Sequence, residues 1–204
     1  YCIMQVVNTD NRLFLILRSL RANQWIKNLV VFTAVIFSGE LFNQPVLLQT
    51  MEAFFLFCLL SSTSYVFNDI VDYPNDKKHP IKRFRPIASG RISIQEATFT
   101  VFILVIVSLV LALLFSVQFF FISLLFLVLH IVYSLYLKKH PIIDIFTISL
   151  SFMIRAFAGV VATGLAIPIW LMFTIFFGSL FVATVKRDAE LTAYGREARA
   201  SLMS

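Results

Sequence analysis

The sequence predicts an all-α protein, a polytopic bundle of transmembrane helices, on three observations. The first is composition: of the 204 residues, 59% are hydrophobic and only 14% are charged, with a mean hydropathy of +0.88. Soluble domains carry about 25% charged residues. The second is a series of long apolar stretches, and the third is a one-sided distribution of basic residues between them. The bilayer is therefore the expected solvent.

Six apolar stretches approach the length of about 20 residues that a spanning helix needs. They are residues 25–41, 46–67, 94–115, 119–137, 142–164 and 168–185. The first is the shortest of the six. Before it, apolar and basic residues alternate over positions 12–21, a pattern typical of an amphipathic helix on the membrane surface.

Basic residues gather in every second connection. Lys and Arg occupy positions 12–27, 77–91, 138–139 and 186–199, whereas the connections near 39–46, 116–118 and 165–168 contain none. The positive-inside rule places the basic connections in the cytoplasm and predicts a multi-pass protein of the cell membrane. The net charge of +6 then reflects topology and contact with anionic lipid. Because no separate basic domain exists, nucleic-acid binding is not expected.

An acidic motif follows the second stretch, and its members are Asn68, Asp69, Asp72 and Asp76. If the helix continues past position 67, Asn68 and Asp72 lie one turn apart and share a face with Asp69. Pro74 ends or kinks that helix, so Asp76 reaches back from the loop. Clustered oxygen ligands suit Mg²⁺, which completes its shell with substrate phosphates. The alternative is a solvated acidic helix end.

A basic segment comes directly after the acids. Lys82, Arg83 and Arg85 lie between Pro80 and Pro86, and such clusters match phosphate oxygens. The positive-inside bias accounts for some of these residues without any ligand. We expect residues 68–91 to form a cytoplasmic metal- and phosphate-binding region within a single transmembrane domain, residues 1–204.

Together these segments resemble the UbiA-type prenyltransferases, and within them the decaprenyl-phosphate phosphoribosyltransferase branch. The matching segments are N-D-x-x-D-x-x-x-D at 68–76, K-R-F-R-P-I-A-S-G at 82–90, R-A-N-Q-W-I-K-N at 21–28, Y-S-L-Y-L-K at 133–138 with Asp144, R-A-F-A-G at 155–159 and K-R-D-A-E-L at 186–191. The resemblance runs from about position 18 to the end of the sequence.

The sequence also departs from the wider superfamily. Prenyl-diphosphate users carry a second D-x-x-x-D motif, whereas here Asp144 is followed four residues later by Ile148. Asp188 stands where the branch has an aromatic residue. The superfamily has about nine spans, so the resemblance implies that roughly the last third of the fold lies outside these 204 residues.

The second motif lies between the fourth and fifth stretches. Tyr133, Lys138 and Asp144 are expected to face the acids of the first motif from the opposite side of the bundle. The alternative is a basic loop with Asp144 capping a helix. Arg155 follows Asp144 by eleven residues, about three turns or 16 Å deeper on one face. A charge at that depth faces a polar cavity or a partner; a ligand phosphate and a structural pairing both stay open.

The resemblance implies transfer of 5-phosphoribosyl from 5-phosphoribosyl 1-diphosphate to a polyprenyl phosphate, with Mg²⁺ as cofactor and release of diphosphate, for cell-envelope polysaccharide precursors. The implied catalytic residues are Asp69, Asp72, Lys138 and Asp144. The implied substrate-binding residues are Lys27, Asn28, Asn68, Lys82, Arg83, Arg85, Tyr133, Arg155, Lys186 and Arg187. The implied metal ligands are Asn68, Asp69, Asp72 and Asp76.

Two other functions share some of these sequence features. A prenyl-diphosphate transferase acting on an aromatic or haem acceptor shares the first motif, but it would need a second acidic pair. A channel or transporter would show polar positions along several spans, and these stretches are mostly apolar. The sequence leaves open the polyprenyl chain length and whether the protein forms a homo-oligomer.

Overall fold

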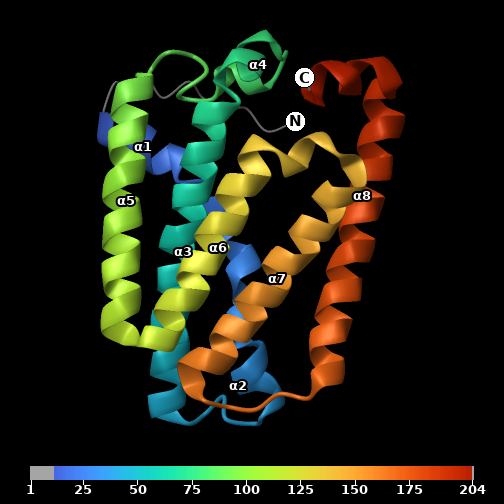
Figure 1. The fold of residues 1–204 in the computed structure, drawn as a ribbon. Helices are drawn as coiled ribbons and strands as arrows, with labels where there is room; N and C mark the ends of the chain where they lie inside the picture. Colours follow the sequence, from blue (N-terminus) through green and yellow to red (C-terminus); the bar gives the residue numbers. More distant parts are fainter. Residues whose placement is uncertain (1–11, 204) are drawn as a thin grey trace.

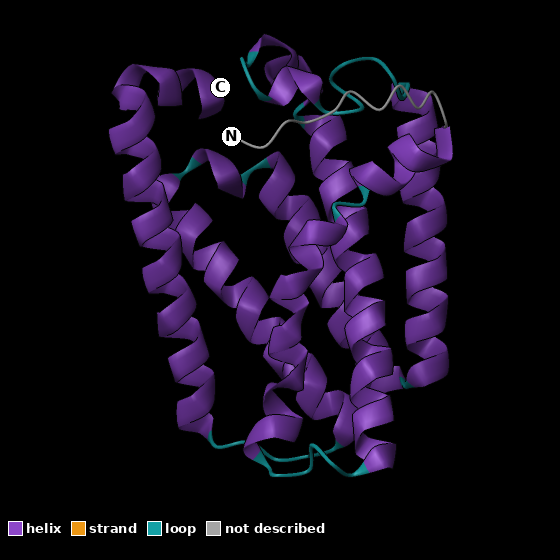
Figure 2. Ribbon diagram, turned by 180° about the vertical axis from the view of Figure 1, so that it is seen from behind, coloured by secondary structure: helices purple, strands orange, loops and turns teal. Residues whose placement is uncertain are grey.

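Every regular element of the described chain is helical (Figures 1 and 2). The computed structural model describes the backbone of residues 12–203 and the side chains of residues 14–189 and 192. In chain order the elements are α1 (Arg12–Ser19), η1 (Ala22–Phe32), α2 (Thr33–Phe37), α3 (Gln44–Val71), α4 (Tyr73–Lys78), η2 (Lys82–Phe84), α5 (Ile94–Phe115), α6 (Val117–Leu135), η3 (Leu137–Lys139), α7 (Pro141–Thr163) and α8 (Ile169–Met203).

Five helices are long and apolar enough to cross a membrane: α3, α5, α6, α7 and the part of α8 at Ile169–Ala189. They confirm five of the six predicted spans, with bounds that differ by a few residues. The α5 helix coincides with its prediction because its start is encoded locally. The Ser93 hydroxyl accepts from the Glu96 amide at 3.1 Å, and the Glu96 carboxylate accepts from the Ser93 amide at 2.9 Å. This capping box satisfies donors that the first turn leaves free.

The prediction of a spanning helix over residues 25–41 is wrong. Residues 22–32 form the 3₁₀ helix η1, and only five residues of α2 continue it. The segment still runs from the end of the bundle that carries α1 to the end that carries α2 (Figure 1). A 3₁₀ helix rises about 2.0 Å per residue against 1.5 Å for an α-helix. Residues 22–32 therefore cover more depth in the bundle than the same number of residues would in an α-helix.

Polar side chains of α3 hold η1 in place. The Trp25 indole donates to the Ser62 hydroxyl at 3.0 Å, and the Ser61 hydroxyl donates to Asn28 Oδ1 at 3.1 Å. Asn28 is fully buried and donates in turn to Cys58 Sγ at 3.3 Å. These bonds satisfy polar groups that the bilayer would leave unpaired.

A close helix approach fixes the other side of η1. Gly159 of α7 lies against Val31, and a Cβ at position 159 would meet the Val31 carbonyl oxygen at 2.0 Å. Only a residue without a side chain allows this approach. Gly159, in the R-A-F-A-G segment, therefore has a packing reason to be glycine.

The core lies between α3, α6 and α7. Its centre is the aromatic set Phe57, Phe119 and Phe126, all fully buried, with Phe57 5.8 and 5.1 Å from the other two ring centroids. The helices α5 and α8 flank this centre on either side (Figure 1) and leave most of their apolar side chains exposed. These two helices present the apolar surface expected of a lipid-facing segment.

The predicted basic connections lie at one end of the bundle, except that residues 22–27 continue from it along η1. Figure 1 shows α1, α4 and the turn between α6 and α7 at that end, whereas the α5–α6 and α7–α8 connections lie at the opposite end with α2. The α1 helix has the predicted amphipathic character: Leu15 is buried in a small cluster with Val66 and Ile87, whereas Leu17 and Arg18 are exposed. We call the end that carries α4 the basic end.

Candidate active site

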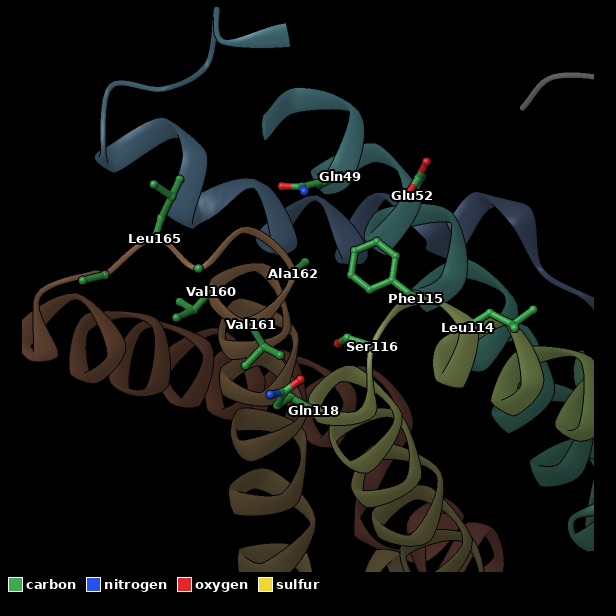
Figure 3. A pocket seen from close by; sticks show the side chains of 12 residues that line it. Gln49, Glu52, Leu114, Phe115, Ser116, Gln118, Val160, Val161, Ala162 and Leu165 are labelled. Carbon is green, nitrogen blue, oxygen red and sulfur yellow. The ribbon is translucent and has the colours of Figure 1, made fainter. Parts of the chain in front are cut away.

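Two cavities of similar size occupy opposite ends of the bundle. The cavity near α2, about 760 Å³, has Gln49 and Glu52 on one side and Gln118 on the other (Figure 3). It contains none of the motif residues. The other, about 780 Å³, opens among η1, α3, α6, α7 and α8 and is lined by residues of all the predicted segments except the 82–90 loop. We call it the main cavity.

The acidic motif straddles the end of α3. The helix continues past Phe67 to Val71, which meets the condition for a shared face, and Asn68 donates to Asp72 at 3.0 Å across one turn. The chain turns at Asp72, and Pro74 stands in the first turn of α4. Asp76 is buried and belongs to the helix α4, not to a loop as predicted, and it still lies near Asp69 because Arg85 bonds both.

Each carboxylate of the motif is neutralised by a basic side chain. Arg85 donates to Asp76 at 2.6 Å and to Asp69 at 3.1 Å, so one guanidinium joins both acids. Asp69 is only 3% exposed and also pairs with Arg21. A solvated acidic helix end would leave these carboxylates in water. Their burial and pairing instead favour a built polar site.

The second motif meets the first next to the main cavity, as expected. Lys138 forms an ion pair with Asp72, and its Nζ lies 3.4 Å from Asn68 Oδ1. The Tyr133 hydroxyl donates to Asp144 at 2.8 Å. Arg187 of α8 forms a further ion pair with Asp144, which is 2% exposed. The Glu190 and Leu191 side chains of the same α8 segment lie outside the described residues.

Arg155 lies deeper, in a polar network within the bundle. Its Nε donates to Asn28 Oδ1 at 2.8 Å, and its Nη1 donates to the Ser151 carbonyl at 3.0 Å and to the Ser151 hydroxyl. The guanidinium carbon also lies 4.8 and 5.3 Å from the ring centroids of Phe126 and Phe152. Among the residues that the structure describes, no carboxylate pairs with it.

The basic loop contributes unequally to the site. Arg85 reaches the carboxylates, but Arg83 is exposed and stacks on Phe84 at 4.9 Å, and neither it nor Lys82 pairs with an acid in the described part of the chain. His79 organises the turn: its Nδ1 accepts from the backbone N–H groups of Ile81 and Lys82 at 3.1 and 3.2 Å. Partial burial, with the charge of Lys82, lowers the pKa of His79 below its ordinary value. It is a structural loop residue.

The family profile described as "UbiA prenyltransferase family" matches residues 29–196. The chain belongs to this family. The matched residues include both motifs and most of the residues that line the main cavity.

Curated relatives narrow the comparison. The chain is 36% identical over 184 residues to a protein of Corynebacterium glutamicum named decaprenyl-phosphate phosphoribosyltransferase, covering 88% of this chain and 55% of the relative. It is 36% identical over 180 residues to the protein of that name from Mycolicibacterium smegmatis, covering 86% and 57%. The chain thus spans a little over half the length of these relatives.

A solved structure confirms the fold. A UbiA homolog from Archaeoglobus fulgidus bound to DMAPP and Mg²⁺ superposes with a TM-score of 0.72 at 24% identity, covering 92% of this chain and 67% of that one. This likeness establishes the UbiA-type helical bundle for the chain.

The donor chemistry of this UbiA-family site fits Mg²⁺. Asn68, Asp69, Asp72 and Asp76 supply amide and carboxylate oxygens, the ligands this ion prefers. Two of the acids are nearly fully buried and already share a cation, Arg85. Within the described part of the chain, no three His, Cys, Asp or Glu residues are arranged to hold a metal together. Joint ligation would therefore require Arg85 or Lys138 to release its carboxylate.

Three residues of this site were missed by sequence reasoning. Arg21 pairs with Asp69 and also lies over the Tyr65 ring at 5.6 Å. Tyr65 and His130 both line the main cavity. Arg21 opens the R-A-N-Q-W-I-K-N segment, so its position in a matching motif was an available signal. His130 stands within an apolar run, where nothing in the local pattern distinguishes it.

Proposed function

We propose that the full-length protein is a membrane transferase that moves 5-phosphoribosyl from 5-phosphoribosyl 1-diphosphate to a polyprenyl phosphate and releases diphosphate, with Mg²⁺ as cofactor. The names of the relatives support decaprenyl phosphate as the lipid. Membership of a membrane-bound prenyltransferase family supports a lipid substrate. The site supports a donor rich in phosphate.

The observation that carries the proposal is the meeting of Lys138 with Asp72 and Asn68. The second motif brings one carboxylate, Asp144, and one cation to the first motif. A prenyl-diphosphate user would bring a second acidic pair instead. The additional cation suits a donor that bears a phosphate beyond its diphosphate, as 5-phosphoribosyl 1-diphosphate does.

The reaction needs charge stabilisation more than proton transfer. An oxygen of the lipid phosphate forms a bond to ribose C1, while the bond from C1 to the diphosphate oxygen breaks and the electron pair leaves with diphosphate. The lipid phosphate is already an anion, so it requires no general base. The ribosyl centre becomes oxocarbenium-like, and the cost lies in the charge that develops on the leaving group.

The residues divide this work by position. Asn68, Asp69, Asp72 and Asp76 would hold Mg²⁺, which when bound neutralises charge on the diphosphate. Arg85 and Lys138 are placed to bind phosphate oxygens once they release their carboxylates. Tyr133 and Arg187 hold the Asp144 carboxylate in the cavity wall, where it faces the donor. Lys82 and Arg83 are expected to bind the 5-phosphate from the loop.

The proposal is tested by incubating the full-length protein in nanodiscs with labelled 5-phosphoribosyl 1-diphosphate and decaprenyl phosphate. We expect a labelled lipid and free diphosphate in Mg²⁺, and neither product in a chelator. A parallel reaction offers a prenyl diphosphate with an aromatic acceptor. Turnover of that pair, with no use of 5-phosphoribosyl 1-diphosphate, would replace our proposal by the prenyl-diphosphate alternative.

A further inference from the structure

The wall of the main cavity contains two cations, Lys27 and Arg155, that pair with no acid of the described chain. Two other lining cations are paired, Arg21 with Asp69 and Arg187 with Asp144. Lys27 also lies within electrostatic range of Arg155 and Lys186. The positive charge therefore accumulates around Lys27.

This pair lies deeper than the carboxylates. Arg155 follows Asp144 by eleven residues on α7, about 16 Å along an α-helix. Lys27 follows Arg21 by six residues on η1, about 12 Å along a 3₁₀ helix. The Asn28 side chain, next to Lys27, accepts from Arg155 Nε, so the two depths coincide. Cations at such depth are costly and mark ligand or ion sites.

Apolar side chains form much of the cavity wall around the pair, together with hydroxyl groups such as that of Ser151. Val30 lies one 3₁₀ turn from Lys27, and Phe152 lies near the Arg155 guanidinium. The α8 helix contributes Ile175 and Val182 to the same cavity. An anion that binds here must tolerate apolar walls. A phosphate ester with a hydrocarbon tail does so, whereas a highly charged soluble sugar phosphate loses more hydration.

We propose that Lys27 and Arg155 form a second anion subsite, which binds the phosphate of the lipid acceptor. The inference rests on the proposed function and assigns one part of the site to the donor and another to the acceptor. The donor diphosphate is held at the basic end by the acidic motif, and the acceptor phosphate is held from below. Arg155 presents a guanidinium held rigid by Asn28 and Ser151, so its remaining donors are already oriented.

Direct binding tests the subsite without the transfer reaction. The full-length protein in detergent, with EDTA present, is titrated with farnesyl phosphate, farnesol, inorganic phosphate and 5-phosphoribosyl 1-diphosphate, and melting temperature is followed. The variants are Lys27→Met, which removes one charge, and Arg155→Lys. The second variant keeps the positive charge but loses the planar guanidinium. Lys139→Met is the matched control, because Lys139 is an exposed lysine outside the cavity.

We expect farnesyl phosphate to stabilise the wild type and the Lys139→Met variant without Mg²⁺, and farnesol not to do so. Lys27→Met should weaken this binding at least about tenfold, as the loss of one charge-assisted hydrogen bond predicts. Arg155→Lys should weaken farnesyl phosphate binding as well. This variant tests the subsite if Lys27→Met does not fold. Unchanged farnesyl phosphate binding in the folded variants would overturn the inference.

The donor arm separates the two phosphate sources. If Lys27→Met weakens Mg²⁺-dependent binding of 5-phosphoribosyl 1-diphosphate and spares farnesyl phosphate, the pair serves the donor and the inference is wrong. If the protein never uses 5-phosphoribosyl 1-diphosphate but binds farnesyl phosphate through Lys27, the subsite stands and the proposed function fails. The two failures are therefore distinguishable.

Discussion

Asp69 and Asp72 end the same helix but face different partners: Asp69 meets Arg21 and Arg85, and Asp72 meets Lys138. We expect Asp69→Asn or Asp72→Asn to reduce turnover of the full-length protein to near background. An amide is a weaker ligand for Mg²⁺ than a carboxylate, and it no longer neutralises Arg21 at position 69 or Lys138 at position 72. Labelled lipid formed per minute measures the loss, and size-exclusion profiles in detergent check the fold.

Glu52→Gln is the matched control for these variants. Glu52 belongs to the same helix, α3, but faces the opposite cavity (Figure 3). The control should retain wild-type turnover. Full activity of Asp69→Asn and Asp72→Asn at ordinary Mg²⁺ would remove the metal-site interpretation.

Lys138 is the residue on which the choice of donor depends. A charge-assisted hydrogen bond to phosphate contributes about 1.5–3 kcal/mol, and about 1.4 kcal/mol is tenfold. Lys138→Ala should therefore raise the KM for 5-phosphoribosyl 1-diphosphate by roughly one to two orders of magnitude and barely change the KM for the lipid phosphate. Lys139→Ala, the exposed neighbour, should change neither. A rise confined to the lipid KM would contradict the assignment.

At the scale of elements, η1 and α7 approach closely at Gly159. Gly159→Ala should destabilise the protein, because the new Cβ would lie 2.0 Å from the Val31 carbonyl oxygen and neither backbone can yield freely. Overpacking of this kind costs about 1–3 kcal/mol, more than the gain of about 1 kcal/mol for alanine over glycine in a helix. A lower melting temperature in detergent is the expected measurement.

Gly178→Ala provides the comparison for that variant. Gly178 lies within α8, and a Cβ there would meet nothing within 4 Å. Its melting temperature should equal or exceed that of the wild type. Equal melting temperatures for Gly159→Ala and the wild type would mean that η1 and α7 separate more easily than this packing implies.

At the scale of the whole molecule, the unequal ends of the bundle predict its orientation. The basic end carries the loops from α3 to α5 and from α6 to α7 (Figure 2), and the positive-inside rule assigns it to the cytoplasm. In a protein with Cys2 and Cys58 replaced by serine, Gln118→Cys should react with an impermeant thiol reagent added outside cells. Lys78→Cys should react only after lysis. Both positions are exposed, so reactivity reports sidedness. Outside labelling of position 78 alone would reverse the orientation.

Local patterns were enough to predict most of the fold and part of the site. The span of α5 followed from its apolar run alone, and the Asn68–Asp72 contact followed from the spacing of one helical turn. Both depend on residues within a few positions of one another. The one-sided charge likewise placed every basic loop at one end without knowledge of packing.

Contacts between distant residues needed the folded bundle. Arg21 and Asp69 are 48 positions apart, Lys138 and Asp72 are 66 apart, and Arg155 and Asn28 are 127 apart. No periodicity specifies which helices become neighbours at such separations. The 3₁₀ conformation of η1 also became visible only in the folded bundle. Its apolar residues alone predict an α-helix, whereas the structure shows a 3₁₀ helix with buried hydrogen bonds to α3 and a close contact with Gly159. The sequence alone thus predicted a membrane environment, most of the helices and the motif residues. Packing between helices determined which cations face which acids, and it placed both Lys27 and Arg155 in the cavity wall.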